Sequence, residues 1–383
     1  MKECSGMSVA DQSMYAENLA DFESKLQRLF EEWKTRPLSV PENQFPADLL
    51  KALHAIGAFD ALFSVEENGL GLCQTPTGGL TLLTLLRRTG SLNLALGRCL
   101  EGHVNVVRLV EMYGTTSQRH ALKLRLKEGS LAGIWVTDGN PAVTIVREGP
   151  SYRLSGIKGF ASGIKQVSLA LITATSEQGD AVMALVPTTR SERQRPGPGT
   201  LTGMQASGTG GYDFTGLQLS PEDLLGSAGD YLRQPEFSAG AWRGSAVALG
   251  GIDRLVDLLR QELLARGRAD NPHQLARIGE ALILQKTASM WVKEAAQAAY
   301  STHMKSEDVT SVVNLARLAV ERAALDLITL VQRSLGVSAF IKGNAVEQVM
   351  RDLATYLRQP APDEALTEAA SWFVHHDWPK TVP

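Results

Sequence analysis

Between two segments of helical periodicity the chain reads LAGIWVTDGNPAVTIVREGPSYRLSGIKGFASG, residues 131–163. β-Branched and aromatic residues recur here in short runs, and Gly149-Pro150 separates two of these runs. Similar runs continue downstream, and the segment 131–229 holds 16 of the 35 glycines of the chain. Short strands about ten residues apart, divided by turn residues, are typical of a small sandwich or barrel. We therefore expect an antiparallel β-sandwich or barrel over residues 131–229.

The C-terminal flank of this segment is almost free of helix-breaking residues. From 274 to 359 there is no proline, and only Gly279, Gly336 and Gly343 interrupt the sequence. Because a proline in a helix interior costs about 3 kcal/mol, its absence over this length predicts long helices. Apolar residues recur three and four positions apart within these helices, as expected for helices that share a core.

The N-terminal flank also has helical periodicity, including an apolar helix over 77–100 that we expect to break near Gly90. At 383 residues the chain exceeds the size at which a single core keeps growing. We therefore predict an α+β multidomain fold. Its expected parts are a disordered tail over 1–14, an N-terminal all-α domain over 15–130, the middle β domain over 131–229, and a C-terminal four-helix bundle over 230–383.

Composition excludes several classes of function. The net charge of −3 gives no reason to expect a nucleic-acid partner or an anionic membrane surface. No apolar run reaches the length of about 20 residues that a membrane span needs, and the polar N-terminus does not resemble a secretory signal. The three cysteines show no CxxC spacing and the seven histidines are scattered, so we expect no metal site. We predict a cytoplasmic protein.

Five phrases along the chain carry a family resemblance. They are FDALFSVEENGLGL (59–72), GIWVTD (133–138), LSGIKGFASG (154–163), FTGLQLSPEDLLG (214–226), and QRSLGVSAF (332–340) followed by Arg351-Asp352-Leu353. Together they resemble, in order and in position, the acyl-CoA dehydrogenase family, a group of FAD flavoproteins with an α–β–α domain order. The resemblance extends from about residue 46 to residue 357.

This resemblance implies a flavin site at the edge of the β domain. An isoalloxazine ring is flat and has hydrogen-bonding edges, so it needs polar donors at one side and an apolar wall on one face; the protein positions and tunes it. Residues 135–137 can supply donors, and residues 160–162 an aromatic wall with a second donor. The family's FAD pyrophosphate contact corresponds to Arg266 or the nearby Arg268, and its ADP contact to the turn at residue 336, commonly from a neighbouring subunit. The candidate cofactor-binding residues are thus Trp135, Thr137, Phe160, Ala161, Ser162, Arg266, Leu335 and Gly336.

Each candidate also has a purely structural interpretation. Trp135 and Phe160 can belong to the core of the sheet, and Arg266 can be a solvated helix charge. Gly336 can simply end a helix, because glycine is favoured at that position. His103 lies in a helix where the family often has histidine, and we interpret it as a packed side chain.

The catalytic base of the family is missing. In most members it is a glutamate that falls near Pro360 here, and in others it lies on the first long helix of the last domain, near Gly240. Neither position is acidic, which makes this chain a divergent member by resemblance. Asp363 and Glu364 are the substitute candidates, if the loop before them folds inward. The family's phosphate-binding serine is also absent, and Thr144 is its possible replacement.

Three hypotheses about function follow. The first is a flavin-dependent oxidoreductase that carries out α,β-dehydrogenation of an acyl thioester or a related small molecule, with an electron-acceptor protein. The second is a flavin-dependent monooxygenase on the same fold, which needs oxygen and no glutamate base. The third is a non-catalytic member. By resemblance we expect a homodimer or homotetramer.

Overall fold

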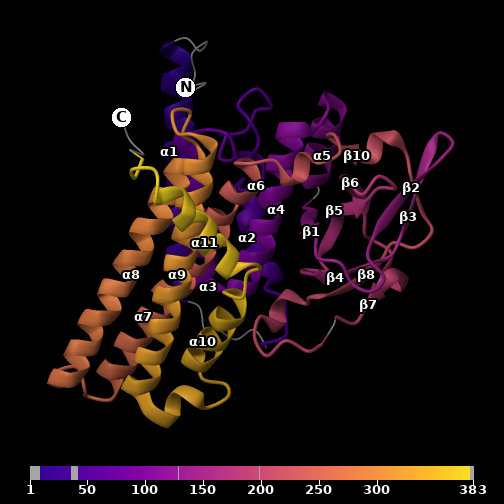
Figure 1. Ribbon diagram of the computed structural model, residues 1–383. Helices are drawn as coiled ribbons and strands as arrows, with labels where there is room; N and C mark the ends of the chain where they lie inside the picture. Colours follow the sequence, from indigo (N-terminus) through magenta and orange to yellow (C-terminus); the bar gives the residue numbers. More distant parts are fainter. Residues whose placement is uncertain (1–8, 36–41, 128, 198, 380–383) are drawn as a thin grey trace.

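A computed structural model describes residues 9–35, 42–127, 129–197 and 199–379 (Figure 1). A group of N-terminal helices stands between a bundle of long C-terminal helices and a β domain. The N-terminal helices are α1 (Val9–Lys34), α2 (Ala47–Ala55), α3 (Pro76–Leu92), α4 (Leu94–Tyr113) and α5 (Thr116–Lys127). The C-terminal helices are α6 (Glu236–Ala239), α7 (Ala241–Ala265), α8 (Pro272–Ala299), α9 (Ser306–Leu335), α10 (Ala345–Tyr356) and α11 (Pro362–Phe373). The α–β–α order predicted from the sequence is confirmed.

The tail predicted over residues 1–14 overlaps the first helix. Residues 1–8 lie outside the described residues, whereas residues 9–14 belong to the first turns of α1. The helix break predicted near Gly90 lies three residues later, at Asn93. The helix α3 continues through Gly90 to Leu92, and the side chain of Asn93 then caps α4 by accepting a hydrogen bond from the backbone N–H of Leu96 at 2.9 Å.

The β domain combines a larger and a smaller sheet in the described part of the chain. The strands are β1 (Leu131–Trp135), β2 (Thr144–Glu148), β3 (Ser151–Ser155), β4 (Ile157–Ala161), β5 (Val167–Thr175), β6 (Ala181–Pro187), β7 (Gln194–Arg195), β8 (Gly210–Asp213), β9 (Leu217–Leu219) and β10 (Leu224–Leu225). The larger sheet has the order β10-β6-β5-β2-β3-β9, with β1 paired to β5, and the smaller has the order β4-β8-β7. Most pairs are antiparallel as predicted, but β1 and β2 run parallel to β5, so the larger sheet is mixed. The parallel β1–β5 pair is possible because the 31 residues between them, 136–166, are long enough for a crossover.

One predicted strand is in fact two strands from different sheets. Residues 152–160 were expected to form a single alternating strand, yet β3 pairs with β2 and β9 whereas β4 pairs with β8. The chain turns at Gly156, whose φ of +114° is a backbone conformation that other residues rarely adopt. A Cβ atom at this position would also overlap with the carbonyl oxygen of Ala142. Gly156 therefore turns the chain from one sheet into the other and aims β4 at the helical domain.

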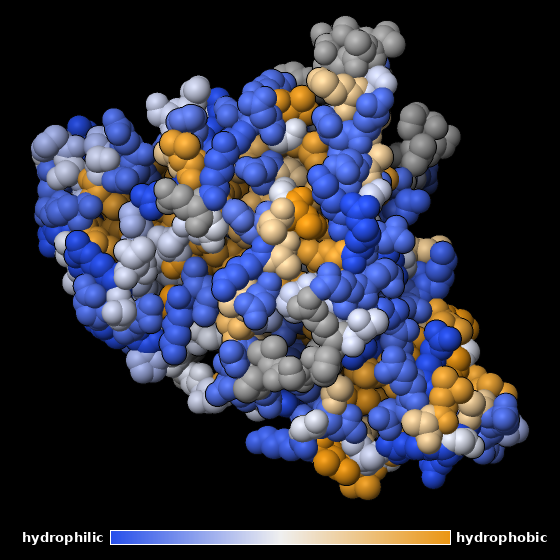
Figure 2. Space-filling model, turned by 180° about the vertical axis from the view of Figure 1, so that it is seen from behind, coloured by the Kyte–Doolittle hydropathy of each residue, from blue (hydrophilic) through white to orange (hydrophobic). Residues whose placement is uncertain are grey.

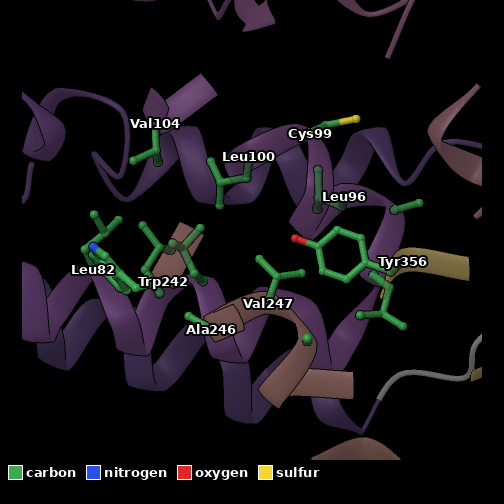
Figure 3. Packing of buried hydrophobic residues seen from close by; sticks show 14 of the residues in the cluster. Leu82, Leu96, Cys99, Leu100, Val104, Trp242, Ala246, Val247 and Tyr356 are labelled. Carbon is green, nitrogen blue, oxygen red and sulfur yellow. The ribbon is translucent and has the colours of Figure 1, made fainter. Parts of the chain in front are cut away.

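The N-terminal helices and the C-terminal bundle share one hydrophobic core. Glycines bring α3 and α7 together, because a Cβ at Gly90 would overlap with the carbonyl of Val247, and one at Gly250 with the carbonyl of Arg87. Figure 3 shows α4 on the same core, with Leu96 and Leu100 facing Val247 and the ring of Tyr356. Within the bundle, α9 packs against α7, α8 and α11, and α10 packs against α7.

The helix α9, together with the following turn, is long and apolar enough to cross a membrane by length and composition alone. Half of its most apolar window is buried inside the protein, and a core helix of a folded domain passes the same test. Its contacts with three neighbouring helices account for this composition.

His103 joins the helical part to the β domain. The side chain is fully buried on α4, and its Nδ1 accepts a hydrogen bond of 3.0 Å from the backbone N–H of Ala132 in β1. Its ring also packs on Phe59 with ring centroids 4.4 Å apart. Burial, and to a smaller extent nearby His54, lowers the pKa of His103 to about 3. The interpretation of His103 as a packed side chain thus agrees with its position.

A first prediction concerns the turn between β3 and β4. We expect Gly156→Ala to lower the free energy of unfolding by at least about 3 kcal/mol, because it combines an unfavourable φ with an overlap against backbone. Gly149→Ala is the matched control, since Gly149 also has a positive φ but no atom lies within 4 Å of its added Cβ. The control should cost about 1 kcal/mol. Equal losses in urea unfolding would contradict the role assigned to Gly156.

A second prediction concerns the pH dependence of stability. A histidine in the unfolded chain has a pKa of about 6.5, whereas buried His103 stays neutral until the pH is much lower. Below pH 6.5 the unfolded chain therefore binds a proton that the folded chain does not bind, and the free energy of unfolding falls. At pH 5 this loss is about 2 kcal/mol relative to pH 7. His103→Gln keeps a hydrogen-bond acceptor but does not titrate, so the free energy of unfolding of this variant should fall less between pH 7 and pH 5, by the same difference. His120→Gln, on the surface of α5, should match the unchanged protein; an unaltered slope for His103→Gln would refute the prediction.

Candidate functional site

The edge of the β domain brings three of the predicted flavin-binding residues together. Phe160 on β4 is 44% exposed although it lies in a strand, and Thr137, just after β1, is also exposed. The backbone N–H of Gly159 donates to the carbonyl of Thr137 at 3.0 Å, which fixes the two segments side by side. The Ser162 hydroxyl follows β4 and accepts from the hydroxyl of Thr209 at 3.3 Å. We call Thr137, Phe160 and Ser162 the β-edge group.

Two predicted residues of this segment face inward instead. Trp135 is 1% exposed, its ring packs on Tyr212 with centroids 5.6 Å apart, and its Nε1–H donates to the carbonyl of Ser162 at 3.0 Å. Ala161 is fully buried between the sheets. The side chain of Trp135 therefore holds the β-edge group in place from behind and does not present its face at the edge.

A buried lysine fixes the backbone behind the β-edge group. Lys158 is 1% exposed, and its Nζ donates to the carbonyl of Val136 at 2.7 Å, to Asp138 at 2.6 Å and to the Thr173 hydroxyl at 3.3 Å. Burial lowers the pKa of Lys158, whereas the contact with Asp138 opposes this shift. Because its bonds flank residue 137 on both sides, Lys158 positions Thr137 relative to β4.

The remaining cofactor candidates lie together at the far end of the bundle. Arg266 follows α7, and its Nη1 donates to the Ser338 hydroxyl at 2.9 Å, in the short helix Gly336–Phe340 that follows Leu335. Its Nε and Nη2 both donate to Glu262, at 3.0 and 2.5 Å. In Figure 1 this end of the bundle lies away from the β domain. Arg266 and the Gly336 turn, which the resemblance assigns to different parts of FAD, thus lie side by side in this chain, and they do not join the β-edge group.

The same end of the bundle exposes apolar side chains, visible toward the lower right of Figure 2. Exposed apolar residues occur in the last turn of α7, in the first half of α8 and in the segment after α9; they are Leu264, Leu275, Leu282, Ile283, Val337, Phe340 and Ile341.

Two cavities lie along α4 and α7 in the described structure. The first, which we call the Pro360 cavity, measures about 140 Å³ and is lined by Gly244, Arg317, Tyr356 and Pro360 among others. The second, the Arg243 cavity, measures about 190 Å³. Six of its lining residues are Asn105, Arg108, Tyr113, Ile134, Glu236 and Arg243. Glu101 and Ala241 line both cavities.

The Arg243 cavity borders β1, the strand that Thr137 of the β-edge group follows. Ile134 of β1 lines the Arg243 cavity, and Thr137 follows three residues later, at most about 11 Å along an extended chain. On the other side, a Cβ at Gly163, next to Ser162, would lie 3.2 Å from the sulfur of Cys99 on α4. The cavities and the β-edge group therefore form one candidate site around α4.

The Pro360 cavity contains no free carboxylate at the position where the resemblance places the base. Arg317 donates to the carbonyls of Pro360 and Ala361, at 3.2 and 3.3 Å, and so holds this loop. Glu101 is 9% exposed and is bound by Arg98 at 2.5 Å and by the Asn105 amide. The buried hydroxyl of Tyr356 has no hydrogen-bond partner among the described residues, and burial raises its pKa, so it remains a donor.

The substitute bases proposed from the sequence lie elsewhere. Asp363 and Glu364 are exposed in the first turn of α11 and do not line either cavity, because the helix begins only after the loop held by Arg317. Thr144 and Arg268 are exposed as well. No group of three or more histidine, cysteine or acidic residues in the described ranges could hold a metal ion.

The sequence-based predictions did not include three charged residues that line the candidate site, namely Glu101, Arg243 and Glu236. Glu101 and Arg243 are charged residues in otherwise apolar stretches of α4 and α7, and this was the available signal. Glu236 lies one helical turn before Gly240, where the resemblance allows a base, so a wider window would have found it.

No family model matches the chain. Among curated proteins, the dibenzothiophene monooxygenase of Mycolicibacterium goodii is 21% identical over 341 residues, covering 78% of this chain and 81% of that protein. The mitochondrial very long-chain specific acyl-CoA dehydrogenase of Macaca fascicularis is 25% identical over 367 residues, covering 89% of this chain. This chain spans 55% of that dehydrogenase, about half of its length.

Solved structures agree on the fold. The dibenzothiophene monooxygenase TdsC from Paenibacillus sp. A11-2, in complex with FMN and indole, has a TM-score of 0.78 at 19% identity and covers 95% of this chain and 98% of its own. Butyryl-CoA dehydrogenase from Megasphaera elsdenii has a TM-score of 0.77 at 15% identity and covers 93% of this chain and 98% of its own. The chain has the acyl-CoA dehydrogenase fold, and the predicted resemblance is confirmed. Its relatives are flavin-dependent oxidoreductases of two kinds, dehydrogenases and monooxygenases.

A third prediction tests the role of Lys158. Lys158→Met removes the donor for Val136 and Asp138, so the backbone that carries Thr137 should loosen. We expect the affinity for flavin, followed by flavin fluorescence, to fall about tenfold, the equivalent of one lost charge-assisted hydrogen bond. Lys165→Met, an exposed position between β4 and β5, is the control and should bind flavin normally. Unchanged binding by Lys158→Met at an unchanged melting temperature would exclude a positioning role.

Proposed function

We propose that this protein is a flavin-dependent monooxygenase that acts on a small organic molecule bound between α4 and α7. The observation that carries this proposal is the absence of a free carboxylate at both positions where the resemblance places a base. At Pro360 the loop is held through its carbonyl by Arg317, and at Gly240 there is no side chain. Glu101, shared by both cavities, is already bound by Arg98 and Asn105. Glu236, the free acid of the Arg243 cavity, lies four residues before Gly240 and so occupies neither of these positions. Dehydrogenation needs a base positioned against the substrate, whereas oxygen transfer does not.

The β-edge group fits one face and one edge of a flavin ring. Phe160 is an exposed aromatic side chain on a strand, which is the apolar wall that a flat ring requires. Thr137 and Ser162 offer hydroxyl groups beside it, and Trp135 and Lys158 hold their backbone from behind. When bound in reduced form, the flavin supplies two electrons to dioxygen, so that one oxygen atom enters the substrate and the other leaves as water.

The residues of this chain orient the substrate. The apolar walls of the Pro360 cavity, including Ala248, Val320 and Leu357, exclude water from the reacting part of the molecule. The hydroxyl of Tyr356, which lines the same space and has no partner among the described residues, is available to donate a hydrogen bond to the substrate. Ala241 and Glu101 line both this cavity and the Arg243 cavity, so the two spaces lie directly beside each other.

FMN is the flavin that the contacts favour, although the sequence predicted FAD. All three nitrogens of the Arg266 guanidinium already bind Glu262 or Ser338, so a pyrophosphate would have to displace Glu262. An adenosine group at the Gly336 turn would also have to come from a second copy. The apolar surface at that end of the bundle supports the predicted homodimer or homotetramer, because exposed apolar patches commonly mark contacts between subunits.

The fourth prediction tests this function. The protein, supplied with reduced FMN and isotopically labelled dioxygen, should insert one labelled oxygen atom into indole, the ligand seen in TdsC, as detected by mass spectrometry. Phe160→Ala should weaken FMN binding about fivefold to a hundredfold, the range for loss of an aromatic stacking partner. Leu124→Ala, also an exposed apolar side chain, should bind FMN normally.

Other outcomes would point to the alternatives. Anaerobic bleaching of the bound flavin by an acyl thioester, without labelled product, would support α,β-dehydrogenation. A colourless protein that binds neither FMN nor FAD would support a non-catalytic role. Either result would overturn the proposed oxygen transfer.

A further inference from the structure

Two arginines lie at the Arg243 cavity, on the inner faces of α4 and α7. Arg243 is 6% exposed, and its Nε donates to the Asn105 amide oxygen at 2.5 Å. Arg108 donates to the carbonyl of Cys73, and its guanidinium lies 5.5 Å from the ring centroid of Tyr300. Arg243 is buried, whereas Arg108 is half-buried. Buried arginines are rare unless they are paired, so Arg243 in particular requires an explanation.

Neither arginine forms a salt bridge with a carboxylate among the described residues. Two of the three acids that line the cavity have other partners: Glu101 binds Arg98, and Asp230 binds Arg233 and the backbone N–H of Ser227. Each guanidinium carries five N–H donors, and only one donor of each has a described protein partner. Burial lowers the pKa of Arg243, and nearby Arg108 contributes to this shift, but an arginine remains protonated at neutral pH.

The opposite wall of the cavity carries one unpaired acid. Glu236 lines the cavity, and its Oε2 is buried without a hydrogen-bond partner, as is the hydroxyl of Tyr113 beside it. Two guanidinium groups therefore face a single free carboxylate, which leaves an excess of positive charge. Unsatisfied buried polar atoms on both walls indicate that this cavity is built for a polar ligand.

The absence of a side chain at Gly240 leaves space for the guanidinium group of Arg243. A Cβ atom at residue 240 would lie 2.9 Å from Nη2 of Arg243, too close for a normal contact. At the place where the resemblance allows a catalytic carboxylate, this chain thus has a glycine, and the guanidinium of Arg243 borders the space that a side chain would take.

Apolar and aromatic side chains also line the cavity. Tyr231 and Phe237 form an edge-to-face pair with ring centroids 5.4 Å apart, and Leu109, Met112 and Ile134 also line the space. Its volume of about 190 Å³ exceeds the roughly 150 Å³ of an engineered cavity that holds benzene. The walls therefore suit a ring, and the guanidinium groups suit an anionic substituent on it.

We propose that the substrate is an aromatic carboxylate whose carboxylate group binds Arg108 and Arg243. Planar guanidinium groups match carboxylate geometry and can form paired hydrogen bonds with it. This inference deepens the proposed function, because it treats the Arg243 cavity as part of the substrate site, but binding can be measured without flavin turnover.

The test compares indole with indole-3-carboxylate on the full-length protein by isothermal titration calorimetry. The carboxylate should bind about tenfold to a hundredfold more tightly than indole. Arg243→Met should reduce this preference to less than about threefold while leaving indole binding unchanged. Arg260→Met, an exposed arginine of the same helix, is the matched control and should keep the full preference.

A second variant keeps the test decisive if Arg243→Met does not fold, which its melting curve will reveal. Glu236→Gln removes the like charge from the cavity and should tighten carboxylate binding about twofold to fivefold, without effect on indole. Equal affinities for the two ligands in the unchanged protein would overturn the inference, and so would an unaltered preference in both variants. Arginine-dependent binding without oxygen transfer would instead refute the proposed function alone, and oxygen transfer without the preference would refute only this inference.

Discussion

The close approach of α3 and α7 is the constraint on which the candidate site depends. Gly90 and Gly250 allow the two backbones to meet where any side chain would overlap with a carbonyl of the opposite helix. Because α4 follows α3 after the Asn93 cap, this contact also sets the distance between α4 and α7. A wider separation would open the interface seen in Figure 3 and separate Glu101 and Asn105 from Arg243. The site is thus formed where the N-terminal helices meet the bundle, and neither part contains it alone.

The order of helices and strands could be predicted from the sequence, but their pairing could not. Periodicity and breakers located the long helices and the strand-rich middle, because these signals act over a few neighbouring residues. The split at Gly156 was missed, since a glycine in an alternating run does not show that its flanking strands join different sheets. The parallel β1–β5 pair was missed for the same reason. It depends on a crossover whose ends are distant in sequence.

For the candidate site, the sequence predicted the features that depend on the identity of single residues, and it did not predict those that depend on how distant residues pack. The absence of a base near Pro360 and Gly240 could be read directly, because it concerns the identity of single residues. The orientation of Trp135 could not, because strand alternation does not say which face of a curled sheet meets the core. Arg98, Glu101, Asn105 and Arg243 form a chain of contacts between helices about 140 residues apart, as in the bond from Arg243 to Asn105 with a separation of 138. Sequence spacing carries no information about such a pair.

The glycine at residue 240 links the missing catalytic base to the proposed binding of a substrate carboxylate by Arg243. A carboxylate there would face Arg243 at short range, and a guanidinium beside it would hold the carboxylate ionised and lower its basicity. A base and a buried arginine at this spot therefore oppose each other, and only one of them can serve the reaction. With the base absent, the positive charge of Arg243 is free to bind part of the substrate. In the proposed function, the binding of a charged substrate and the lack of a base at this position therefore have the same local cause.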